Sequence, residues 1–400
     1  MGMRHKSESP VTKSPDKVPL LLLPMSLGIG GAETHVVSLA KHLMRRGWEV
    51  HVASAGGKLV RELENAGIEH IHAPLDSRSP VNMLKAYRSI DRFAHSRRIG
   101  LIHAHARIPA WIAEKICDKL GIPMAMTYHG TFASGAFWRA FTRPGDATIA
   151  ISEDIRDYTA REFGFPTSSI TVIPNGIDLD AFREPSPMEK ENARKALLLS
   201  GSTPTIVYAS RLEDDLTEVA RTVIDACGLA RARHPNLSLL VAGDGDGLPA
   251  VQEHAGRANK EAGRDFARCA GYLQDTFPAY AASDLVIGMS RVALEAMACA
   301  RPVVIAGPGG IFGPVEPDAL DELEDRNYTS RSAPHPLTAE RLASEMEAIL
   351  SDPAAQDSMG RFGRKIIAER HSMELVTSQT EQVYEALLSP ISRKSQGTPR

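Results

Sequence analysis

The sequence lacks the features of a chain cross-linked by disulfides or metal ions, and those of a chain that spans a membrane. Its four cysteines lie far apart and form no CxxC pair, so neither a disulfide framework nor a zinc knuckle is indicated. The longest apolar runs, such as residues 18–25, are far shorter than the roughly 20 residues that span a bilayer. An excess of one charge is also lacking, since 46 basic residues face 49 acidic ones. We therefore expect no general affinity for nucleic acid and no metal bound by cysteine.

Glycine and proline, with 31 and 26 residues, fall far short of collagen or low-complexity composition. The apolar share of 43% is typical of globular proteins, and 400 residues at about 150 per domain predict two or three domains. Residues 1–17 are polar and contain no apolar stretch of the kind a signal peptide needs. We expect a disordered tail there and a cytoplasmic protein.

Apolar runs typical of buried strands alternate with segments of helical period. In the first half the runs lie at 18–24, 48–54, 100–105, 123–128, 147–151 and 170–173. A second series lies at 204–210, 237–243, 284–288 and 302–307. This alternation predicts an α/β protein with two doubly wound, Rossmann-like domains built on parallel sheets.

A Pro- and charge-rich stretch, REPSPMEKENARK, interrupts the alternation and marks a domain boundary. We expect an N-terminal domain over 18–185, a linker over 186–200, a C-terminal domain over 201–372 and a tail over 389–400. Charge divides at that boundary: residues 1–185 hold 23 basic and 19 acidic residues, a balance of +4, and the remainder has −7. A basic first half favours contact with an anionic membrane surface or a polyanionic acceptor, although scattered solvated charges give the same count.

The first glycine-rich loop lies between a predicted strand and a predicted helix, in LGIGGAETHVVSLAKHL. Backbone amides at the start of a helix stabilise anions such as phosphate. A dinucleotide fingerprint would require a third small residue where Glu33 stands, which disfavours a nicotinamide cofactor. The glycines are then either a phosphate-binding turn or a turn needed only for chain reversal.

His129 follows a predicted strand directly and is a candidate to hydrogen-bond a sugar hydroxyl or a phosphate. The alternative is a packed polar residue at a strand end. His103 and His105 have i, i+2 spacing and so share one strand face. No third ligand with metal spacing stands nearby, which disfavours a zinc site.

Three polar residues follow strands or begin helices in the second half. Arg211 follows its first strand and could bind diphosphate oxygens with its planar fork, or pair with the neighbouring Glu213 or Asp214. In VAGDGDG, glycines such as Gly243 allow either close approach of a nucleotide or a turn. Glu295 lies in a short helix, where a carboxylate can accept two ribose hydroxyls.

Taken in order, GGAETHVVSLAKHL, HG at 129–130, IPNGIDLDAF, SRL, VAGDG and ALEAMACARPVV resemble the signature of the retaining glycosyltransferases of family 4. The resemblance covers about residues 18–375. It implies the GT-B fold, in which two Rossmann-like domains face a central cleft. It also implies a nucleotide-sugar donor held by the second domain, a glycan, lipid-linked or small-molecule acceptor at the first, a part in polysaccharide biosynthesis, and no metal or other cofactor.

The same resemblance implies roles for individual residues. Amides of Gly30 and Gly31 would approach the donor phosphates, and His129 would assist at the sugar. Arg211 would bind the diphosphate and Glu295 the ribose. Further donor contacts would come from three glycines: Gly243, Gly309 and Gly310. A final helix at about 373–388 would cross back onto the first domain.

The chain departs from the family pattern at three charged positions. Leu216 stands where members carry lysine, and Ile287 stands where they carry the first of two glutamates. The acidic residue after the glycine pair near 309–310 is also replaced, by IFGPV. Arg291, four residues before Glu295, either replaces the missing lysine charge at the diphosphate or pairs with Glu295 along the helix.

We therefore expect a glycosyltransferase weakened by these losses, in contact with the inner membrane surface at most peripherally. The alternatives are a nucleotide-sugar-binding pseudoenzyme that acts as a partner subunit, and a sugar-nucleotide epimerase of the same fold. A nicotinamide oxidoreductase is a further alternative.

Overall fold

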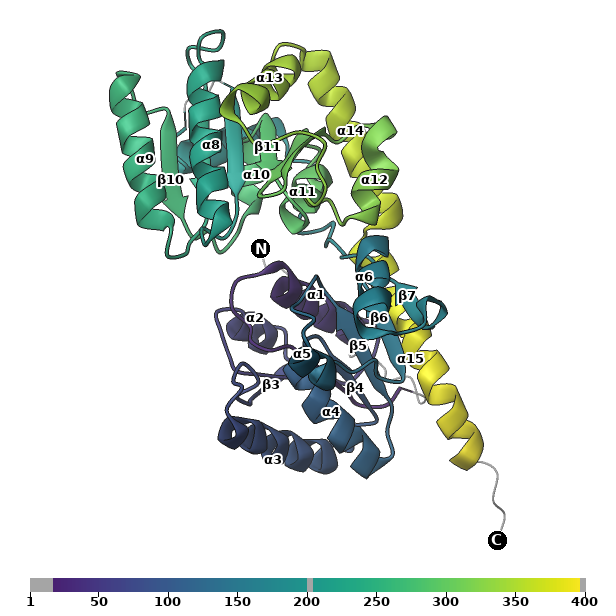
Figure 1. The fold of residues 1–400 in the computed structure, drawn as a ribbon. Coiled ribbons are helices and arrows are strands. Elements are labelled where there is room, and N and C mark those ends of the chain that lie inside the picture. Colours follow the sequence, from purple (N-terminus) through teal and green to yellow (C-terminus); the bar gives the residue numbers. More distant parts are fainter. Residues whose placement is uncertain (1–16, 200–203, 396–400) are drawn as a thin grey trace, which may run out of the picture. The chain divides into compact units, whose positions relative to one another are not determined.

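The computed structural model describes residues 17–199 and 204–395, so most of the tail expected at 1–17 lies outside the described residues. The chain divides into two compact units. Unit 1 comprises the residues up to Ile151, then Ile155–Ile173 and the residues from Val376 onward. Unit 2 comprises Ser152–Asp154 and Pro174–Leu375. The two units are coloured in chain order in Figure 1.

Unit 1 alternates strands and helices along the chain, as the sequence predicts. Its elements are β1 (Leu20–Leu23), α1 (Gly31–Arg45), β2 (Val50–Ser54), α2 (Val60–Asn65), β3 (Glu69–His72), α3 (Pro80–Ser96), β4 (Leu101–Ala104), α4 (Arg107–Leu120), β5 (Met124–Tyr128), α5 (Ala136–Phe141), β6 (Ala147–Ala150), α6 (Glu153–Phe163), β7 (Ile170–Val172) and α15 (Met373–Ser395). The seven strands form one parallel sheet in the order β3-β2-β1-β4-β5-β6-β7. β4 and β5 are therefore neighbours, and their carboxyl ends meet at one edge of the sheet.

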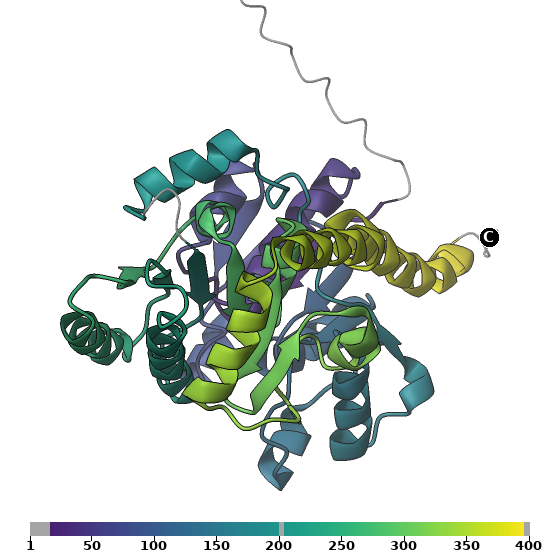
Figure 2. The same cartoon turned by 90° about the horizontal axis from the view of Figure 1, so that it is seen from above.

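Unit 2 repeats this plan with a shorter sheet. Its elements are α7 (Pro187–Ala196), β8 (Thr205–Ala209), α8 (Asp215–Ala230), β9 (Ser238–Ala242), α9 (Leu248–Glu261), β10 (Ala267–Gly271), α10 (Phe277–Ala282), β11 (Leu285–Gly288), α11 (Arg291–Ala298), β12 (Val303–Gly307), β13 (Gly310–Pro314), α12 (Leu320–Asp325), α13 (Ala339–Leu350) and α14 (Pro353–Arg370). The sheet order is β10-β9-β8-β11-β12-β13, with every pair parallel except β12 and β13. Figure 2 shows the same ribbon from above.

The sheet of unit 2 buries apolar side chains on both faces. Ile206 and Tyr208 of β8 pack in one core cluster, while Val207, between them, packs in another. The first cluster includes residues of α8, α9 and α13, and the second includes residues of α10, α11 and α14. Because both faces of these strands are covered, their sequences are continuous apolar runs rather than alternating ones.

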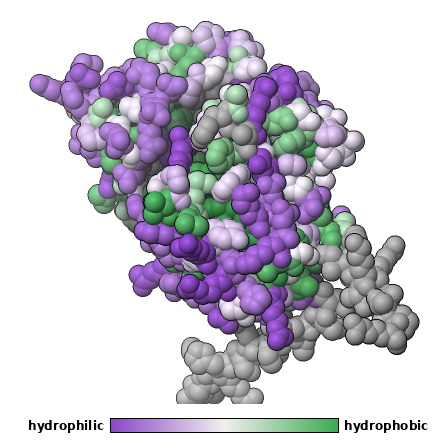
Figure 3. Space-filling model, turned by 60° about the horizontal axis from the view of Figure 1, so that its bottom comes forward, coloured by the Kyte–Doolittle hydropathy of each residue, from purple (hydrophilic) through white to green (hydrophobic). Residues whose placement is uncertain are grey.

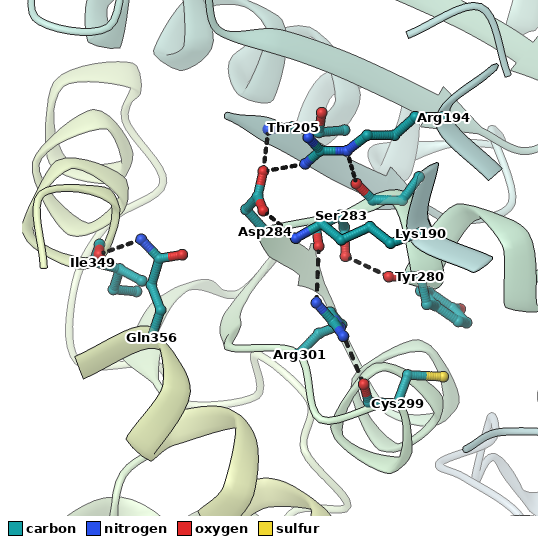
Figure 4. A network of polar contacts seen from close by, with 11 residues as sticks. Lys190, Arg194, Thr205, Tyr280, Ser283, Asp284, Cys299, Arg301, Ile349 and Gln356 are labelled. Carbon is teal, nitrogen blue, oxygen red and sulfur yellow. Dashed lines mark hydrogen bonds and ion pairs between the residues drawn. The ribbon is translucent and has the colours of Figure 1, made fainter. Parts of the chain in front are cut away.

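Residues 186–200, which we expected to be a linker, contain the packed helix α7, so this expectation is wrong over Pro187–Ala196. Ser186 and Glu189 form a capping box at the start of α7, which satisfies backbone donors there. Asp284, at the start of β11, accepts hydrogen bonds from Lys190 Nζ and Arg194 Nη2, both at 2.6 Å (Figure 4). The α7 helix is therefore fixed to unit 2 by ion pairs.

The C-terminal helix α15 extends through Ser395, so the tail expected from 389 is helical over its first seven residues. Within unit 1, Tyr384 of α15 is fully buried, and its ring lies edge-on to Trp48 with 5.4 Å between ring centroids. Glu381 accepts a hydrogen bond from the indole of Trp48 at 2.7 Å. The segment of α15 that belongs to unit 1 is thus part of its packed structure.

No helix within 17–199 and 204–395 combines the length and the apolar character needed to cross a bilayer. The face shown in Figure 3 is mostly hydrophilic, with hydrophobic residues in small groups.

Candidate functional site

Ligands of doubly wound sheets bind beyond the carboxyl ends of the parallel strands. In unit 1 these ends lead into α1 and into the residues after β4 and β5. In unit 2 they lead into α8, α9 and α11. The residues predicted from the sequence lie on these connections, except Gly309 and Gly310, which follow β12.

Gly30 directly precedes α1, and Gly31 is its first residue. The Gly30 carbonyl accepts hydrogen bonds from the backbone N–H and the side chain of Thr34, at 3.0 and 2.9 Å. The Glu33 carboxylate lies against Gly30. A Cβ built on Gly30 would be only 2.2 Å from Glu33 Oε2. An anionic side chain thus already lies at the start of this helix, where it stabilises the helix dipole. A donor phosphate would have to move it aside, and the phosphate role of the two glycines stays a prediction.

Four histidines gather at the carboxyl ends of β4 and β5. They are His35 of α1, His103 of β4, His105 just after β4 and His129 just after β5. The ring centroids of His103 and His105 are 4.1 Å apart, as their shared strand face predicts, and those of His105 and His129 are 5.3 Å apart. His35 lies edge-on to His129 at 5.5 Å. His35 is not among the residues predicted from the sequence, whose only signal for it is its place on the buried face of α1.

Burial keeps three of these imidazoles neutral, those of His103, His105 and His129. It lowers the pKa of His103 to about 3 and that of His129 to about 4, and it holds the pKa of His105 well below its usual value. At neutral pH His129 is therefore a hydrogen-bonding group and not a cation. In the described part of the chain no set of three or more His, Cys, Asp or Glu side chains is placed to hold a metal ion, the histidine cluster included.

Arg211 lies just beyond the carboxyl end of β8, and its side chain is exposed. Within the described residues it forms no ion pair with Glu213, Asp214 or any other acid, so the ion-pair alternative is not what the structure contains. The backbone beside it is fixed, because Leu212 N donates to Asp244 O at 2.9 Å. Arg211 therefore offers a solvated guanidinium at the edge of the sheet where ligands bind.

Gly243 and Gly245 bring the β9–α9 loop against the backbone that follows β8. Gly243 has φ +155°, and a Cβ there would lie 1.9 Å from the carbonyl oxygen of Ser210. Gly245 has φ +144°, and a Cβ would lie 2.5 Å from Leu212 O. Close backbone packing thus explains both glycines. A donor contact at Gly243 stays a prediction.

Glu295 is buried, and protein groups occupy both of its carboxylate oxygens. Arg291 Nε donates to Oε1 at 2.7 Å, and Tyr280 OH donates to Oε2 at 3.0 Å. Thr276 Oγ1 lies 3.3 Å from the same Oε2. Arg291 is itself buried, and its Nη1 lies 3.4 Å from the carbonyl oxygen of Gly176. The intrahelical pair, one of the two alternatives for Arg291, is therefore formed, and the ribose contact of Glu295 stays a prediction.

Gly309 and Gly310 form the tight connection between β12 and β13. Gly309 N donates to Ser330 Oγ at 3.0 Å, and a Cβ at Gly309 would lie 2.1 Å from Ser330 O. Gly310 has φ +126°, and a Cβ there would lie 2.2 Å from His335 O. These glycines are required by chain packing, and their donor contact stays a prediction.

Two of the three departures from the family pattern, at Ile287 and Leu216, can be placed in the structure. Ile287 lies in the middle of β11 and is fully buried in the core, where a carboxylate would have no access to a ligand. The connection from β11 to α11 is only Met289 and Ser290, with Ser290 at φ +50°. Leu216 lies in the first turn of α8. The shortened connection explains why no residue occupies the place of the first glutamate.

A hollow of about 530 Å³ in unit 2 lies at the opposite ends of the strands. Ser238 and Ala267, which begin β9 and β10, line it together with residues of α9. Its two arginines, Arg264 and Arg268, already donate to backbone carbonyls of Pro235 and Leu197. This hollow is separate from the strand ends that carry the predicted residues.

The chain matches two family models. Residues 29–181 match the model described as Glycosyltransferase Family 4, and residues 203–352 match Glycosyl transferases group 1. A curated relative, glycogen synthase of Mycobacterium tuberculosis, is 28% identical over 311 residues, which are 72% of this chain and 69% of the relative.

Solved structures share the fold. A glycosyltransferase from Rickettsia africae aligns with a TM-score of 0.76 and 18% identity, over 93% of this chain and 99% of its own. HepE of Anabaena, solved in complex with UDP and glucose, aligns with a TM-score of 0.72 and 20% identity, over 92% and 99%. This chain has two Rossmann-like units, and each is matched by a glycosyltransferase family model. These matches and the shared fold place the chain among the glycosyltransferases with the GT-B fold.

Proposed function

We propose that this glycosyltransferase binds the diphosphate of its nucleotide-sugar donor with Arg211 and moves the sugar to a hydroxyl of a glycan, lipid-linked or small-molecule acceptor. The observation that carries the proposal is the exposed guanidinium of Arg211 beyond β8, free of ion pairs within the described residues. Guanidinium groups bind phosphate oxygens in bidentate fashion. Since HepE was solved with UDP and glucose, a uridine diphosphate sugar is the first donor to test.

In this proposal neutral His129 hydrogen-bonds the donor sugar, and the amides of Gly30 and Gly31 approach the phosphates once Glu33 has moved. No metal ion is needed, because Arg211 supplies positive charge to the departing diphosphate. Glu295, whose oxygens also accept hydrogen bonds from Arg291 and Tyr280, binds the ribose in this proposal. The acceptor and the contact with a membrane surface stay predictions from the sequence.

The test is the affinity for UDP and UDP-glucose, measured by isothermal titration calorimetry with wild type and Arg211→Ala. Loss of charge-assisted hydrogen bonds to phosphate should weaken binding by about 10- to 100-fold. Arg211→Lys should recover only part of it, because an ammonium lacks the fork. Arg257→Ala, which removes an exposed arginine of α9 paired with Glu253, is the matched control and should leave affinity unchanged.

The outcomes separate the alternatives. Equal affinities of wild type and Arg211→Ala would remove Arg211 from the donor site. Binding of UDP-glucose with neither transfer nor hydrolysis would indicate the pseudoenzyme to which Leu216 and Ile287 point. A changed sugar nucleotide formed without any acceptor would indicate an epimerase. The retention of configuration that the family resemblance implies is tested by the anomeric configuration of the product in proton NMR.

A further inference from the structure

The proposed donor site uses His129 but gives no role to His105. His105 is 5% exposed, and its Nδ1 lies 3.1 Å from Nε2 of His129. The other nitrogens of this pair, His105 Nε2 and His129 Nδ1, are buried and have no hydrogen-bond partner in the described part of the chain. Buried polar atoms are rarely left without partners, so each unused nitrogen needs an explanation.

His103 of the same cluster serves as a comparison, because its hydrogen bonds are purely structural. Its Nδ1 lies 2.6 Å from Tyr384 OH, and its Nε2 lies 2.7 Å from Thr127 Oγ1. Both of its nitrogens are therefore used within unit 1. The pair of His105 and His129 differs, because each ring has one nitrogen bonded to the other ring and one left over.

The contact between the two rings couples their protonation patterns. Each neutral imidazole carries one N–H and one lone pair, and the bond needs one of each. If His105 Nδ1–H donates, then His129 carries its proton on Nδ1. If His129 Nε2–H donates, then His129 Nδ1 presents a lone pair. Burial keeps both rings neutral, so these are the two arrangements available at neutral pH.

We propose that His105 is a positioning residue: it fixes the ring and the tautomer of His129, so that Nδ1 of His129 meets a hydroxyl of the bound sugar. The proposal deepens the function proposed above and rests on it for the identity of the ligand. Without His105, the ring of His129 would lose its only hydrogen bond within the described residues, and its tautomer and orientation would no longer be coupled to a neighbouring ring. His35 and His103 then act as packing partners, His35 edge-on to His129 and His103 with its ring tilted by 35° from that of His105.

The first measurement needs no donor. Protein labelled with ¹⁵N-histidine gives ring nitrogen shifts that distinguish the two neutral tautomers, and His129→Gln identifies the His129 signals among the 14 histidines. We expect one tautomer for His129 in wild type and a mixture in His105→Phe, which keeps a ring but no nitrogen. His105→Asn, whose amide can occupy the place of Nδ1, should restore a single tautomer. His95→Gln on the exposed face of α3 is the control that should change nothing.

The second measurement concerns turnover of UDP-glucose. His105→Phe should lower kcat by about 10- to 100-fold, as expected when a contacting group is misplaced, while His105→Asn recovers part of it. Affinity for UDP, which lacks the sugar, should be the same in all variants and shows that they are folded.

An unchanged His129 tautomer in His105→Phe would overturn the proposal whatever the donor is. A changed tautomer with unchanged kcat would also overturn it, because His129 would then not act on the sugar. A changed tautomer in an enzyme that does not turn over UDP-glucose at all would support the pairing and refute the proposed donor instead.

Discussion

At the scale of single residues, the pair formed by Arg291 and Glu295 shows that one sequence pattern is compatible with two structural roles. The i, i+4 spacing was compatible with a cation directed at a ligand or with an intrahelical pair. In the structure the two side chains are 10% and 8% exposed and joined at 2.7 Å. A buried carboxylate needs such a partner, because removing one member of a buried pair leaves an uncompensated charge.

We predict that Arg291→Met destabilises unit 2 by about 3–5 kcal/mol, because Glu295 would keep a buried charge without its cation. Chemical denaturation followed by circular dichroism measures the loss. The double variant Arg291→Met with Glu295→Gln should recover part of it, since no charge is then left unpaired. Affinity for UDP should stay unchanged in folded Arg291→Met. A stable Arg291→Met protein with weakened UDP binding would show instead that Arg291 reaches the diphosphate.

The sequence identified several candidate residues through their strand-end positions, among them Arg211, His129 and Glu295. It could not show which of them would be free to bind. Arg211 is exposed and forms no ion pair within the described residues, whereas Glu295 is buried and accepts a hydrogen bond from Tyr280 of a different helix. Such a difference depends on contacts between residues far apart in the chain, and no local pattern records it.

At the scale of elements, the strands that the sequence failed to predict are β3, β10 and β13. All three lie at the edges of their sheets. A central parallel strand is apolar on both faces because helices cover both, but an edge strand is only partly buried and its sequence lacks the continuous apolar run. β3 (EHIH) and β10 (ARCAG) carry charged residues for this reason, and β13 contains two glycines and a proline. The central strands, by contrast, are predicted within a few residues.

The helix α7 was also missed, because its polar composition is typical of a linker. Its attachment depends on Asp284, which accepts from two cations of α7 and from the backbone N–H of Thr205 at 2.8 Å (Figure 4). The start of β8, the start of β11 and α7 are thereby joined at one carboxylate.

We predict that Asp284→Asn loosens α7, since an amide lacks the charge that attracts Lys190 and Arg194. A loss of about 2–3 kcal/mol in local stability corresponds to about 30- to 150-fold faster exchange of the α7 amides. Hydrogen exchange of the segment 187–196, followed by mass spectrometry, measures it. Glu191→Gln removes the exposed pair of α7 with Lys195 and should change exchange only slightly. Equal protection in Asp284→Asn and Glu191→Gln would contradict the prediction.

At the scale of the whole molecule, the histidine cluster links the stability of unit 1 to pH. In the folded chain the pKa values of His103 and His129 are about 3 and about 4, both lowered from 6.5 by burial. As pH falls through 6.5 the unfolded chain takes up protons at these residues while the folded chain does not. The unfolded state is therefore stabilised, and the free energy of unfolding falls as pH drops from about 6.5 to about 4.

We predict a slope of about 1.4 kcal/mol per pH unit for each of these two histidines in that range. Urea unfolding followed by tryptophan fluorescence can measure it for unit 1 alone, because all three tryptophans, Trp48, Trp111 and Trp138, belong to that unit. His103→Gln should reduce the slope, whereas His95→Gln, a change on the exposed face of α3, should not. A slope that is equal in wild type and His103→Gln would contradict the role of burial.

The sequence by itself determined the two α/β units, the central strands, the order of the motifs and the glycosyltransferase family, because buried strands and glycine turns are set by local composition and spacing. Only the tertiary structure decided which charged groups are free, that Glu295 is bound by Arg291 and Tyr280, and that four histidines from α1, β4 and β5 meet in one cluster. The physical reason is that sheet order brings together side chains whose separation along the chain carries no signal, and their burial then sets their charge and their partners.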